Sequence, residues 1–400
     1  MGENLTLAYE TFVLKALTQL KPLYREVSEG GALVYAPDPV VYVDSKGRPA
    51  PWKAPVFYNP RGSLTRDLSV AITRRAGSNI QFLDTMCGIG VRGLRISLLD
   101  NVDHSVLNDV NPWAVALTYL GVERNSLIEK VDIQSFGVNA LCAASDYRTG
   151  YDYVDLDPFG SAAPFVPAVL LSVRNGGHLG VCSTDAANLC GNRPNALKRI
   201  YFAFNRDSMS KKETGLRILI GYVVQRAATM GFAAEPVLCY QYADYFRCHF
   251  QISHSFRQAN RLIQKMGYKT GCSEHSPFSE KPFCEVCNKP AEAGPLWTGS
   301  FLSEPFLKEV SVELKLVRSN TIGETKRLVE ALLDEQGIDH PYIDVHRILK
   351  RSGLNPPKKK ALIQSLLQSG FKAASTHFSP TGIRTNAPIQ EVKRVCLSLQ

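Results

Sequence analysis

The run Phe82-Leu83-Asp84-Thr85-Met86-Cys87-Gly88-Ile89-Gly90-Val91-Arg92-Gly93 contains the strongest fold signal of the 400-residue chain. Its apolar start predicts a buried β-strand, and the glycines predict a sharp turn at which the backbone can approach a ligand. A helix is expected after the turn. A strand, a Gly-rich turn and a helix form the first unit of many nucleotide-binding α/β domains. Because Gly88-x-Gly90-x-x-Gly93 also matches the dinucleotide-binding string of dehydrogenases, this run alone leaves the cofactor class open.

Strand-like and helix-like patterns continue to alternate between about residues 78 and 255. This alternation predicts a parallel sheet with crossover helices. The last two expected strands are close enough along the chain to pair antiparallel, which favours a class I methyltransferase sheet over a dinucleotide-binding one. The expected strands are Ile80–Leu83, Ser105–Asn108, Val131–Ser135, Tyr151–Leu156, His178–Ser183, Pro236–Tyr240 and Arg247–Ile252.

A carboxylate, Asp109, follows the second expected strand. In a βαβ unit that begins with a Gly-rich turn, a carboxylate at this point can accept hydrogen bonds from both ribose hydroxyls of a nucleoside. Asp109 is therefore a candidate ribose ligand, although dehydrogenases have a carboxylate at the same place. An alternative role for Asp109 is to cap a helix that begins near Asn111-Pro112.

The segment Asp155-Leu156-Asp157-Pro158-Phe159-Gly160 favours methyl transfer to an amine on a base. The lone pair of such an amine is delocalised into the ring, and an acceptor for its N–H localises the pair during attack on a sulfonium methyl. Asp157 is the candidate acceptor, Asp155 can assist it, and Phe159 can stack on an extruded base. Pro158 ends strand pairing and turns the chain into the cleft. An alternative role for Asp157 is a helix N-cap.

Several strings in a fixed order give the sequence a resemblance to a known family. From about Pro55 onward it resembles the tRNA guanine-N2 dimethyltransferases, which act on guanosine 26 of tRNA. The resemblance implies a class I Rossmann-like methyltransferase domain, S-adenosylmethionine as the cofactor and tRNA as the partner. The strings are Pro55–Pro60, Arg66-Asp67, Gly90–Arg95, Asn108-Asp109, Asp155–Gly160, Thr184-Asp185, Leu189–Gly191, Gly294–Gly299, Thr376–Phe378 and Gly382–Thr385.

The resemblance also implies roles for single residues. Arg66, Arg92 and Asp109 would hold the cofactor, since guanidinium groups suit the methionine carboxylate, and Asp157 would be the catalytic carboxylate. Without the resemblance, the two arginines would be interpreted as a solvated helix face or an internal ion pair. The expected cofactor-binding residues are Arg66, Asp84, Gly88, Gly90, Arg92, Asp109, Val138, Asn139 and Pro158.

Two departures from the family pattern bear on the cofactor site. Thr65 stands where the family usually has Asn before Arg-Asp. The family often has an acidic residue and Ala after the third strand to hold the adenine, whereas this chain has Phe136-Gly137-Val138-Asn139. We therefore expect adenine recognition to depend more on backbone groups and on Val138.

A smaller α+β domain with a winged-helix-like order is expected at the C-terminus. Its helical patterns, Tyr342–Arg351 and Lys358–Gln368, flank the turn Ser352–Pro357, and a strand-like run, Phe371–Phe378, follows. The N-terminal segment is Pro- and Gly-rich with short β-type runs such as Val40–Val43. The expected domains are an extension that packs on the catalytic domain (1–62), a methyltransferase domain (63–265), a zinc-binding insert and linker (266–320), and a basic tRNA-binding domain (321–400).

Four potential metal ligands lie in the expected insert. Cys272-x-x-His275 and Cys284-x-x-Cys287 are two ligand pairs separated by eight residues. This spacing suits a tetrahedral structural Zn²⁺ site with three Cys and one His. The alternatives are a redox pair, although this loop lacks the helix N-terminus that activates such thiols, and an irregular loop with incidental cysteines.

The formal net charge of +9 favours a polyanionic partner. Residues 301–400 contain 15 Lys or Arg against 10 Asp or Glu, and residues 345–360 contain no acidic residue. Basic charge at a helix-turn-helix corner fits contact with tRNA phosphates, although such a run is often only a solvated face. The expected tRNA-binding residues are Arg347, Lys350, Arg351, Lys358, Lys359 and Lys360.

The composition and the termini restrict the class of protein. No apolar run is long enough to span a membrane, no signal-peptide pattern is present, and ten cysteines in 400 residues do not form a disulfide framework. We expect a cytoplasmic protein and no protein partner. Besides the guanine-N2 methyltransferase, two functions stay open: a non-catalytic tRNA-binding protein, and an amine methyltransferase for another base, such as adenine N6 in DNA. The intact Asp109, Asp157 and Gly-rich turn favour an enzyme.

Overall fold

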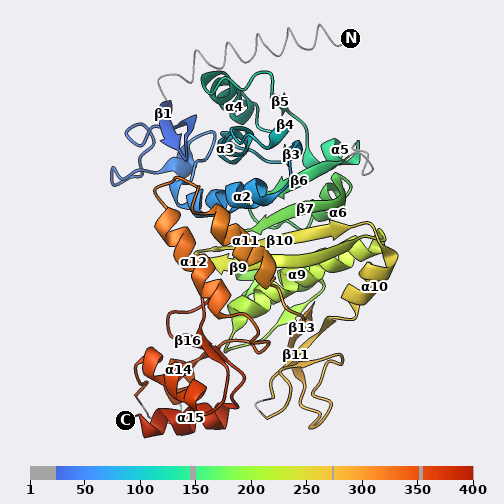
Figure 1. Cartoon of the computed structure of the whole chain (residues 1–400), viewed down its shortest axis with the longest axis vertical. Coiled ribbons are helices and arrows are strands. Elements are labelled where there is room, and N and C mark those ends of the chain that lie inside the picture. Colours follow the sequence, from blue (N-terminus) through green and yellow to red (C-terminus); the bar gives the residue numbers. More distant parts are fainter. Residues whose placement is uncertain (1–23, 145–149, 273, 351–354, 400) are drawn as a thin grey trace. The chain divides into compact units, whose positions relative to one another are not determined.

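The computed structural model describes residues 24–144, 150–272, 274–350 and 355–399 (Figure 1). The chain divides into two compact units, and the elements α6, α11, α12 and β7 have residues in both. The expected division into four domains stays a prediction. The first unit comprises Met1–Asp157, Ala168–Leu179 and Glu309–Lys326, and the second comprises Pro158–Pro167, Gly180–Lys308 and Arg327–Gln400.

The main sheet has seven strands in the order β5-β4-β3-β6-β7-β10-β9. Strand β3 is parallel to β4 and β6, β4 is parallel to β5, and β9 and β10 are antiparallel. All seven strands expected from the sequence are confirmed, and so is the antiparallel last pair. The strands are β3 (Ile80–Asp84), β4 (Val102–Asn108), β5 (Val131–Gln134), β6 (Tyr151–Leu156), β7 (Val173–Ser183), β9 (Ala233–Tyr242) and β10 (Tyr245–Ser253).

The first unit also contains a hairpin that the sequence did not predict. Strands β1 (Tyr24–Glu29) and β2 (Ala32–Pro37) pair antiparallel through Gly30 and Gly31, both of which have positive φ. Helix α4 (Pro112–Arg124) packs on β2. The start of the described chain is therefore part of a folded layer and not only an irregular extension.

The β-type run Val40–Val43 does not form a strand. The Val41 N–H donates to the Asp38 carbonyl at 3.1 Å, and Val43 alone makes a β-bridge, to Pro49. Because Val40 is 81% exposed, the run has no core to pack against, and the Asp-Pro turn prevails over the β-propensity of valine.

Local signals determine where the helices of the first unit begin. Asn111 caps α4 by accepting a hydrogen bond from the Trp113 N–H at 3.0 Å, and Pro112 takes the first helical position. Gly93 allows α3 to pack on β4, since a Cβ there would lie 2.1 Å from the Leu107 side chain. The other helices are η2 (Pro51–Lys53), η3 (Pro60–Gly62), α2 (Ser63–Arg75), α3 (Val91–Ser97), α5 (Val138–Ala143) and α6 (Val166–Leu170).

The second unit is built around the 19-residue helix α9 (Lys211–Thr229). This helix packs on β9 and on β13 (Figure 1). Strand β13 belongs to a second sheet with the order β12-β11-β13-β8. The strands of that sheet are β8 (Phe204–Asn205), β11 (Met266–Thr270), β12 (Phe278–Ser279) and β13 (Ala291–Trp297), and the other helices are α7 (Ala186–Leu189), α8 (Pro194–Tyr201), α10 (Phe256–Ile263), α11 (Glu304–Glu313) and α12 (Ile322–Asp334).

The C-terminal part of the second unit has its own hydrophobic core, which includes Leu349, Leu366 and Ile383. Two predicted helices are present, the first of them three residues shorter at its start than expected; the corner Arg351–Leu354 between them lies outside the described residues. The elements are β14 (Ile343–Asp344), α13 (Val345–Lys350), α14 (Lys359–Gln368), β15 (Ala373–Ser375), β16 (Gly382–Thr385) and α15 (Ile389–Ser398), with the sheet order β14-β16-β15.

The strand expected at Phe371–Phe378 is confirmed only for its central residues, β15. Strand β15 ends where the chain bonds to the Glu335 side chain. The His377 N–H donates to this carboxylate at 2.7 Å, and the Thr376 hydroxyl donates to it at 3.1 Å. These bonds to α12 and its end replace further strand pairing.

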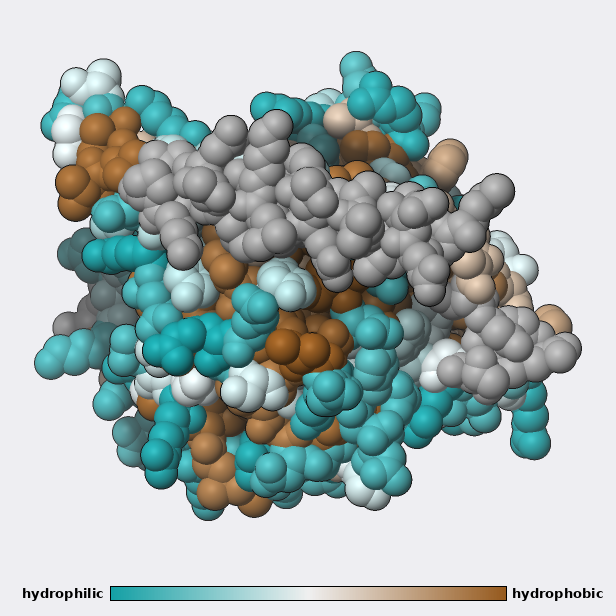
Figure 2. Space-filling model, turned by 90° about the horizontal axis from the view of Figure 1, so that it is seen from above, coloured by the Kyte–Doolittle hydropathy of each residue, from teal (hydrophilic) through white to brown (hydrophobic). Residues whose placement is uncertain are grey.

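The surface of the described residues includes both hydrophilic and hydrophobic side chains (Figure 2). Figure 2 shows one face, on which hydrophilic side chains surround smaller hydrophobic patches. Among the helices of the described residues, none is long and apolar enough to cross a membrane.

Candidate functional site

The Gly-rich turn between β3 and α3 has the backbone geometry that the sequence predicted. Gly88 has a φ of 57° and Gly90 a φ of 77°, in the left-handed region that glycine tolerates. The Cys87 N–H donates to the Asn108 carbonyl at 2.8 Å and ties the turn to the end of β4. The turn therefore lies at the carboxyl edge of the parallel strands, where α/β domains bind ligands.

Asp109 links this turn to the start of α4. Its two carboxylate oxygens accept hydrogen bonds from the Gly88 and Asn111 N–H groups, each at 2.9 Å. Because Asn111 caps α4, the capping role considered for Asp109 is wrong. Burial raises the pKa of Asp109 above its ordinary value. Each oxygen keeps a lone pair for a further donor such as a ribose hydroxyl.

One arginine holds the two carboxylates of the Asp-Leu-Asp segment. Arg92 Nε lies 3.0 Å from Asp155 Oδ2, and Arg92 Nη2 lies 2.5 Å from Asp157 Oδ2. Asp155 is fully buried and also accepts a hydrogen bond from the Tyr153 hydroxyl at 3.1 Å. The Asp157 side chain is 33% exposed. Of the two carboxylates, Asp157 is therefore the one that a substrate amine can reach.

Helix α2 fixes the guanidinium of Arg92. Arg92 Nη1 donates to Ser69 Oγ at 2.7 Å, and Nη2 lies 3.4 Å from Thr65 Oγ1. Thr65 thus supplies an oxygen at the position where the resembled family usually has Asn.

Asp84, the last residue of β3, lies next to this group. Its side chain is buried, and neither carboxylate oxygen accepts a full hydrogen bond from a described residue. Burial and the neighbouring charge of Asp155 raise the pKa of Asp84 to about 8, although Arg92 opposes them. A buried carboxyl group without a partner costs stability, and such groups are common where a ligand completes the site.

Arg66 is held by Glu29 of the hairpin. Arg66 Nε and Nη2 lie 2.6 and 2.7 Å from the Glu29 oxygens, and Arg95 Nη1 lies 2.9 Å from the same carboxylate. Burial favours a high pKa for Glu29, but the two arginines lower it below its ordinary value. No sequence pattern indicated Glu29, because its partners are 37 and 66 residues away. The role of Arg66 as a cofactor ligand stays a prediction.

The segment after β5 is fixed by Asn108. The Asn108 amide donates to the Phe136 carbonyl at 3.0 Å, and its oxygen accepts from the Phe136 N–H at 2.9 Å. Val138 is buried at the start of α5, and Asn139 is exposed. Their expected contacts with an adenine stay predictions.

In the second unit, the loop that follows Pro158 presents an aromatic ring. Phe159 is 80% exposed. The next residue, Gly160, donates its N–H to the Thr184 hydroxyl at 2.7 Å and accepts from the Thr184 N–H at 2.9 Å. An exposed ring on a fixed backbone suits stacking on a planar base.

A hydrogen-bonded group that the sequence analysis did not assign supports this loop. The Tyr201 hydroxyl, at the end of α8, lies 3.0 Å from both carboxylate oxygens of Asp185 and 2.8 Å from Ser161 Oγ. Burial and the Asp185 charge raise the pKa of Tyr201 far above its ordinary value. The string Thr184-Asp185 contributes to the family resemblance, but no local pattern in the sequence indicates Tyr201 as the partner of Asp185.

The structure brings the four predicted metal ligands together. The ligand atoms of Cys272, His275, Cys284 and Cys287 all lie within 4.8 Å of one another. Cys272 Sγ lies 3.6 Å from Cys287 Sγ and 3.1 Å from His275 Nδ1. A tetrahedron with Zn–S bonds of about 2.3 Å has edges of about 3.8 Å, close to the observed S–S separation. Backbone N–H groups of Cys287 and Val286 lower the pKa of Cys284 to about 6, which favours the thiolate that a metal requires.

The predicted tRNA-binding residues are on the C-terminal part of the second unit. Arg347 donates to the Ser208 carbonyl and lies 3.9 Å from Asp344, so its guanidinium is partly engaged. Arg351 lies outside the described residues. The other four, Lys350, Lys358, Lys359 and Lys360, are exposed or half-buried.

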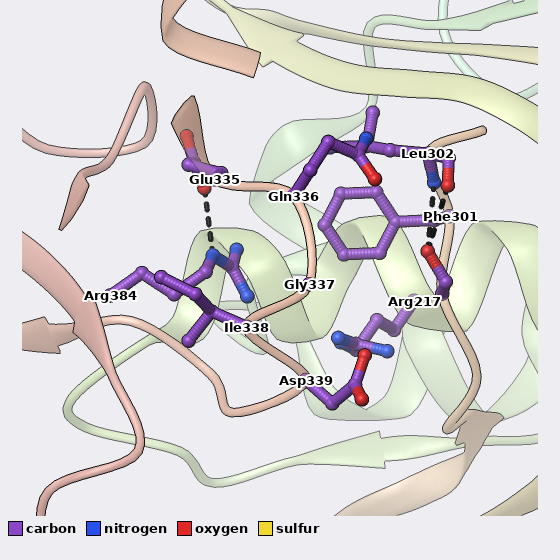
Figure 3. Close-up of a pocket in the computed structure, with 10 residues that line it drawn as sticks. Arg217, Phe301, Leu302, Glu335, Gln336, Gly337, Ile338, Asp339 and Arg384 are labelled. Carbon is purple, nitrogen blue, oxygen red and sulfur yellow. Dashed lines mark hydrogen bonds and ion pairs between the residues drawn. The ribbon is translucent and has the colours of Figure 1, made fainter. Parts of the chain in front are cut away.

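Buried ion pairs connect the family strings of the C-terminal part to α9. Arg384 lies 2.8 Å from both Glu335 and Glu213, and Arg217 lies 2.9 Å from Glu213. Figure 3 shows Arg384, Glu335 and Arg217 around a small pocket. The cavity volume of about 20 Å³ holds no more than a water molecule, so this cluster is structural.

Comparisons with known proteins agree with this geometry. A family model described as "N2,N2-dimethylguanosine tRNA methyltransferase" matches residues 38–397. A tRNA (guanine(26)-N(2))-dimethyltransferase from Methanothermobacter thermautotrophicus is 32% identical over 362 residues, which cover 87% of this chain and 94% of the relative. The protein of the same name from Thermococcus kodakarensis is 34% identical over 368 residues, 86% of this chain and 93% of the relative.

A solved structure extends the likeness to three dimensions. The complex of Trm1 from Pyrococcus horikoshii with S-adenosyl-L-methionine matches with a TM-score of 0.81 and 28% identity. The match covers 93% of this chain and 99% of that one.

Proposed function

The chain belongs to the N2,N2-dimethylguanosine tRNA methyltransferase family, and from this premise we propose that it transfers methyl groups from S-adenosylmethionine to the exocyclic N2 amine of guanosine 26 in tRNA. The observation that carries the chemistry is Asp157, a partly exposed carboxylate held by Arg92 and followed by the exposed ring of Phe159. A tRNA substrate also supports a cytoplasmic location.

The residues at the carboxyl edge of β3 and β4 fit the proposed cofactor. Asp84 is a buried carboxyl group that accepts no full hydrogen bond from a described residue, and an ammonium group such as that of the methionine moiety would supply one. Asp109 offers free lone pairs for ribose hydroxyls. When bound, S-adenosylmethionine supplies an electrophilic methyl group on a sulfonium. The other cofactor ligands in this proposal are Arg66, Gly88, Gly90, Arg92, Val138, Asn139 and Pro158.

Asp157 orients the amine and receives its proton. The guanine leaves its stack and lies against Phe159, and Asp157 accepts a hydrogen bond from N2–H. This bond would localise the nitrogen lone pair, and as the methyl group leaves the sulfonium sulfur and bonds to N2, the amine would lose a proton toward the Asp157 carboxylate. Asp155, which is enclosed, assists by holding Arg92 in place and is therefore a positioning residue.

The replacement Asp157→Asn tests this assignment. It keeps the shape of the side chain, removes the charge and offers a donor where an acceptor is needed, so the methylation rate should fall on the order of 100-fold or more. S-adenosylmethionine affinity should be retained. Asp152→Asn is a matched control, since Asp152 is on the same strand and pairs with Arg174. A near-parental rate for the Asp157 variant would refute the assignment, whereas loss of cofactor binding would move Asp157 into the cofactor site.

The target base is tested with tRNA transcripts that differ only at position 26. Labelled S-adenosylmethionine should methylate the guanosine transcript and not the adenosine transcript. Tight binding of both transcripts without methylation would favour the non-catalytic tRNA-binding protein. Methylation of adenine would favour an amine methyltransferase for another base.

Two further assignments belong to the same proposal. We propose a structural Zn²⁺ at Cys272, His275, Cys284 and Cys287, supported by the mutual approach of their ligand atoms. We also propose that tRNA phosphates contact the basic residues of the C-terminal part, which supply affinity and no chemistry. These residues are Arg347, Lys350, Arg351, Lys358, Lys359 and Lys360.

A further inference from the structure

We propose that α8 and the chain up to the start of α9 form a second tRNA-binding surface, which contacts the phosphates near the extruded guanosine. The inference rests on the proposed function, because it takes tRNA as the ligand. We define this α8 surface by six basic residues and one aromatic residue: Arg193, Lys198, Arg199, Phe202, Arg206, Lys211 and Lys212.

The α8 surface has an unbalanced positive charge. Residues 193–212 include six Lys or Arg and a single acid, Asp207, which is buried and lies 3.1 Å from Lys269. None of the six basic side chains forms an ion pair with a described residue. Four of them are exposed, and Lys211 and Lys212 are half-buried. Clustered cations without carboxylate partners are complementary to a polyanion.

Phe202 gives this surface a second feature that points to nucleic acid. It follows α8 with a φ of 54°, in the left-handed region where glycine is preferred, and its side chain is 68% exposed. A large ring in this backbone conformation and open to solvent is unfavourable in the free protein. Unstacked bases of RNA pair well with exposed aromatic rings and neighbouring basic groups, and the Arg226 guanidinium lies 6.0 Å from the centre of the Phe202 ring.

Hydrogen bonds join this surface to the loop that presents Phe159. Tyr201, the last residue of α8, is bonded to Asp185 and Ser161, and Thr184, next to Asp185, holds Gly160. The end of the basic helix is thus fixed to the loop on which the target base is proposed to stack. A nucleotide chain that delivers a base to Phe159 would have its phosphates near α8.

The α8 surface is also continuous with the C-terminal basic residues. Arg347 of α13 donates to the Ser208 carbonyl, between Arg206 and Lys211. Both basic groups belong to the second unit. We infer that one tRNA is held by both, with the α8 surface next to the base and the C-terminal residues farther along the molecule.

The double variant Lys198→Ala/Arg199→Ala tests the electrostatic part. Each lost phosphate contact lowers the slope of log Kd against log salt by about 0.7 to 0.9, so the slope should fall by about 1.4 to 1.8. Binding at about 0.1 M salt should weaken roughly tenfold or more. The control Lys281→Ala/Lys308→Ala removes the same charge from exposed residues that pair with Glu285 and Glu304, and it should leave the slope unchanged.

S-adenosylmethionine affinity should be the same for each variant, which shows that the cofactor site is intact, and tRNA binding by the parent separates this inference from the proposed function. Failure of the parent protein to bind or methylate tRNA would refute the function. A parent that binds tRNA, together with an α8 variant that behaves like the control, would refute the inference.

Phe202→Gly tests the aromatic part without a risk to folding. Glycine suits the left-handed backbone, so the melting temperature should be unchanged or higher. The salt slope should stay the same, while kcat/KM for tRNA should fall about tenfold through the loss of one stacked base. A lower melting temperature with unchanged kcat/KM would show that Phe202 only packs against Arg226 and would overturn its assignment to RNA.

Discussion

Replacement of Asp84 by Asn should stabilise the cofactor-free protein and weaken cofactor binding. Asn has nearly the same shape as a protonated Asp, and it has no charge to bury. The Asp84 carboxyl group is enclosed beside Asp155 and Asp157, the Arg92 charge lowers its pKa, and Cys87 is a further neighbour. An uncharged residue at this position removes a cost that folding imposes on the ionised group.

The size of the effect follows from the shifted pKa. The pKa of Asp84 is about 8 in the folded protein and 3.8 in its ordinary state. Because the folded value is the higher one, the native state is most favoured at low pH, and stability is lost as the pH rises toward 8. At about 1.4 kcal/mol for each pKa unit, the cost is about 2 kcal/mol at pH 5, about 4 at pH 7 and about 6 at pH 9. Asp84→Asn should remove this pH-dependent cost from the free energy of unfolding.

Denaturant unfolding at the three pH values, with parent and variant side by side, measures the prediction. The advantage of the variant should grow with pH. Asp103→Asn is the control, since Asp103 is exposed, and its effect should not follow this trend. Calorimetry should show weaker S-adenosylmethionine binding to the Asp84 variant, and the parent should release about one proton on binding at pH 7. A variant no more stable than the parent at pH 9 would refute the reasoning.

The remaining predictions concern the metal and the C-terminal surface. The protein as purified should contain about one zinc per chain by elemental analysis. If protein that was never exposed to a chelator contains no metal, the proposed zinc site is wrong. Cys284→Ser should lower the zinc content and loosen residues 266–297 in hydrogen exchange before it affects cofactor affinity, whereas Cys190→Ser, outside the cluster, should keep the metal. Replacement of Lys358, Lys359 and Lys360 together by Ala should weaken tRNA binding and flatten its salt dependence while S-adenosylmethionine affinity stays constant; an unchanged slope would make these lysines a solvated face.

The main sheet could be predicted because its strands are buried. Parallel strands covered on both faces have near-continuous apolar runs, and the runs at β3 and β6 end in recognisable strings. In the β1–β2 hairpin only β2 is an apolar run; β1 contains the polar residues Arg25, Glu26 and Ser28, and the pairing depends on a Gly-Gly turn. A short two-stranded element of this kind is visible only in its tertiary context.

The candidate site could be predicted residue by residue but not as a network. Asp157 and Arg92 were each assigned a role, yet the sequence did not indicate that they pair with each other. It gave no sign of Glu29 or of the bond between Tyr201 and Asp185. Ion pairs and hydrogen bonds between distant residues leave no periodic pattern, because one polar side chain on each element is enough to form them.

Asp84 and Phe202 share a property that connects the two main proposals. Each position violates a local rule: Asp84 is an acid buried without a full hydrogen bond from a described residue, and Phe202 is an exposed ring on a left-handed backbone. At each position another residue would suit the free protein better, Asn at one and Gly at the other. Violations of this kind are expected at functional sites, where the ligand supplies the missing partner. A cation can complete the first and a nucleotide base the second, and these are the two ligands that transfer of a methyl group to tRNA brings together.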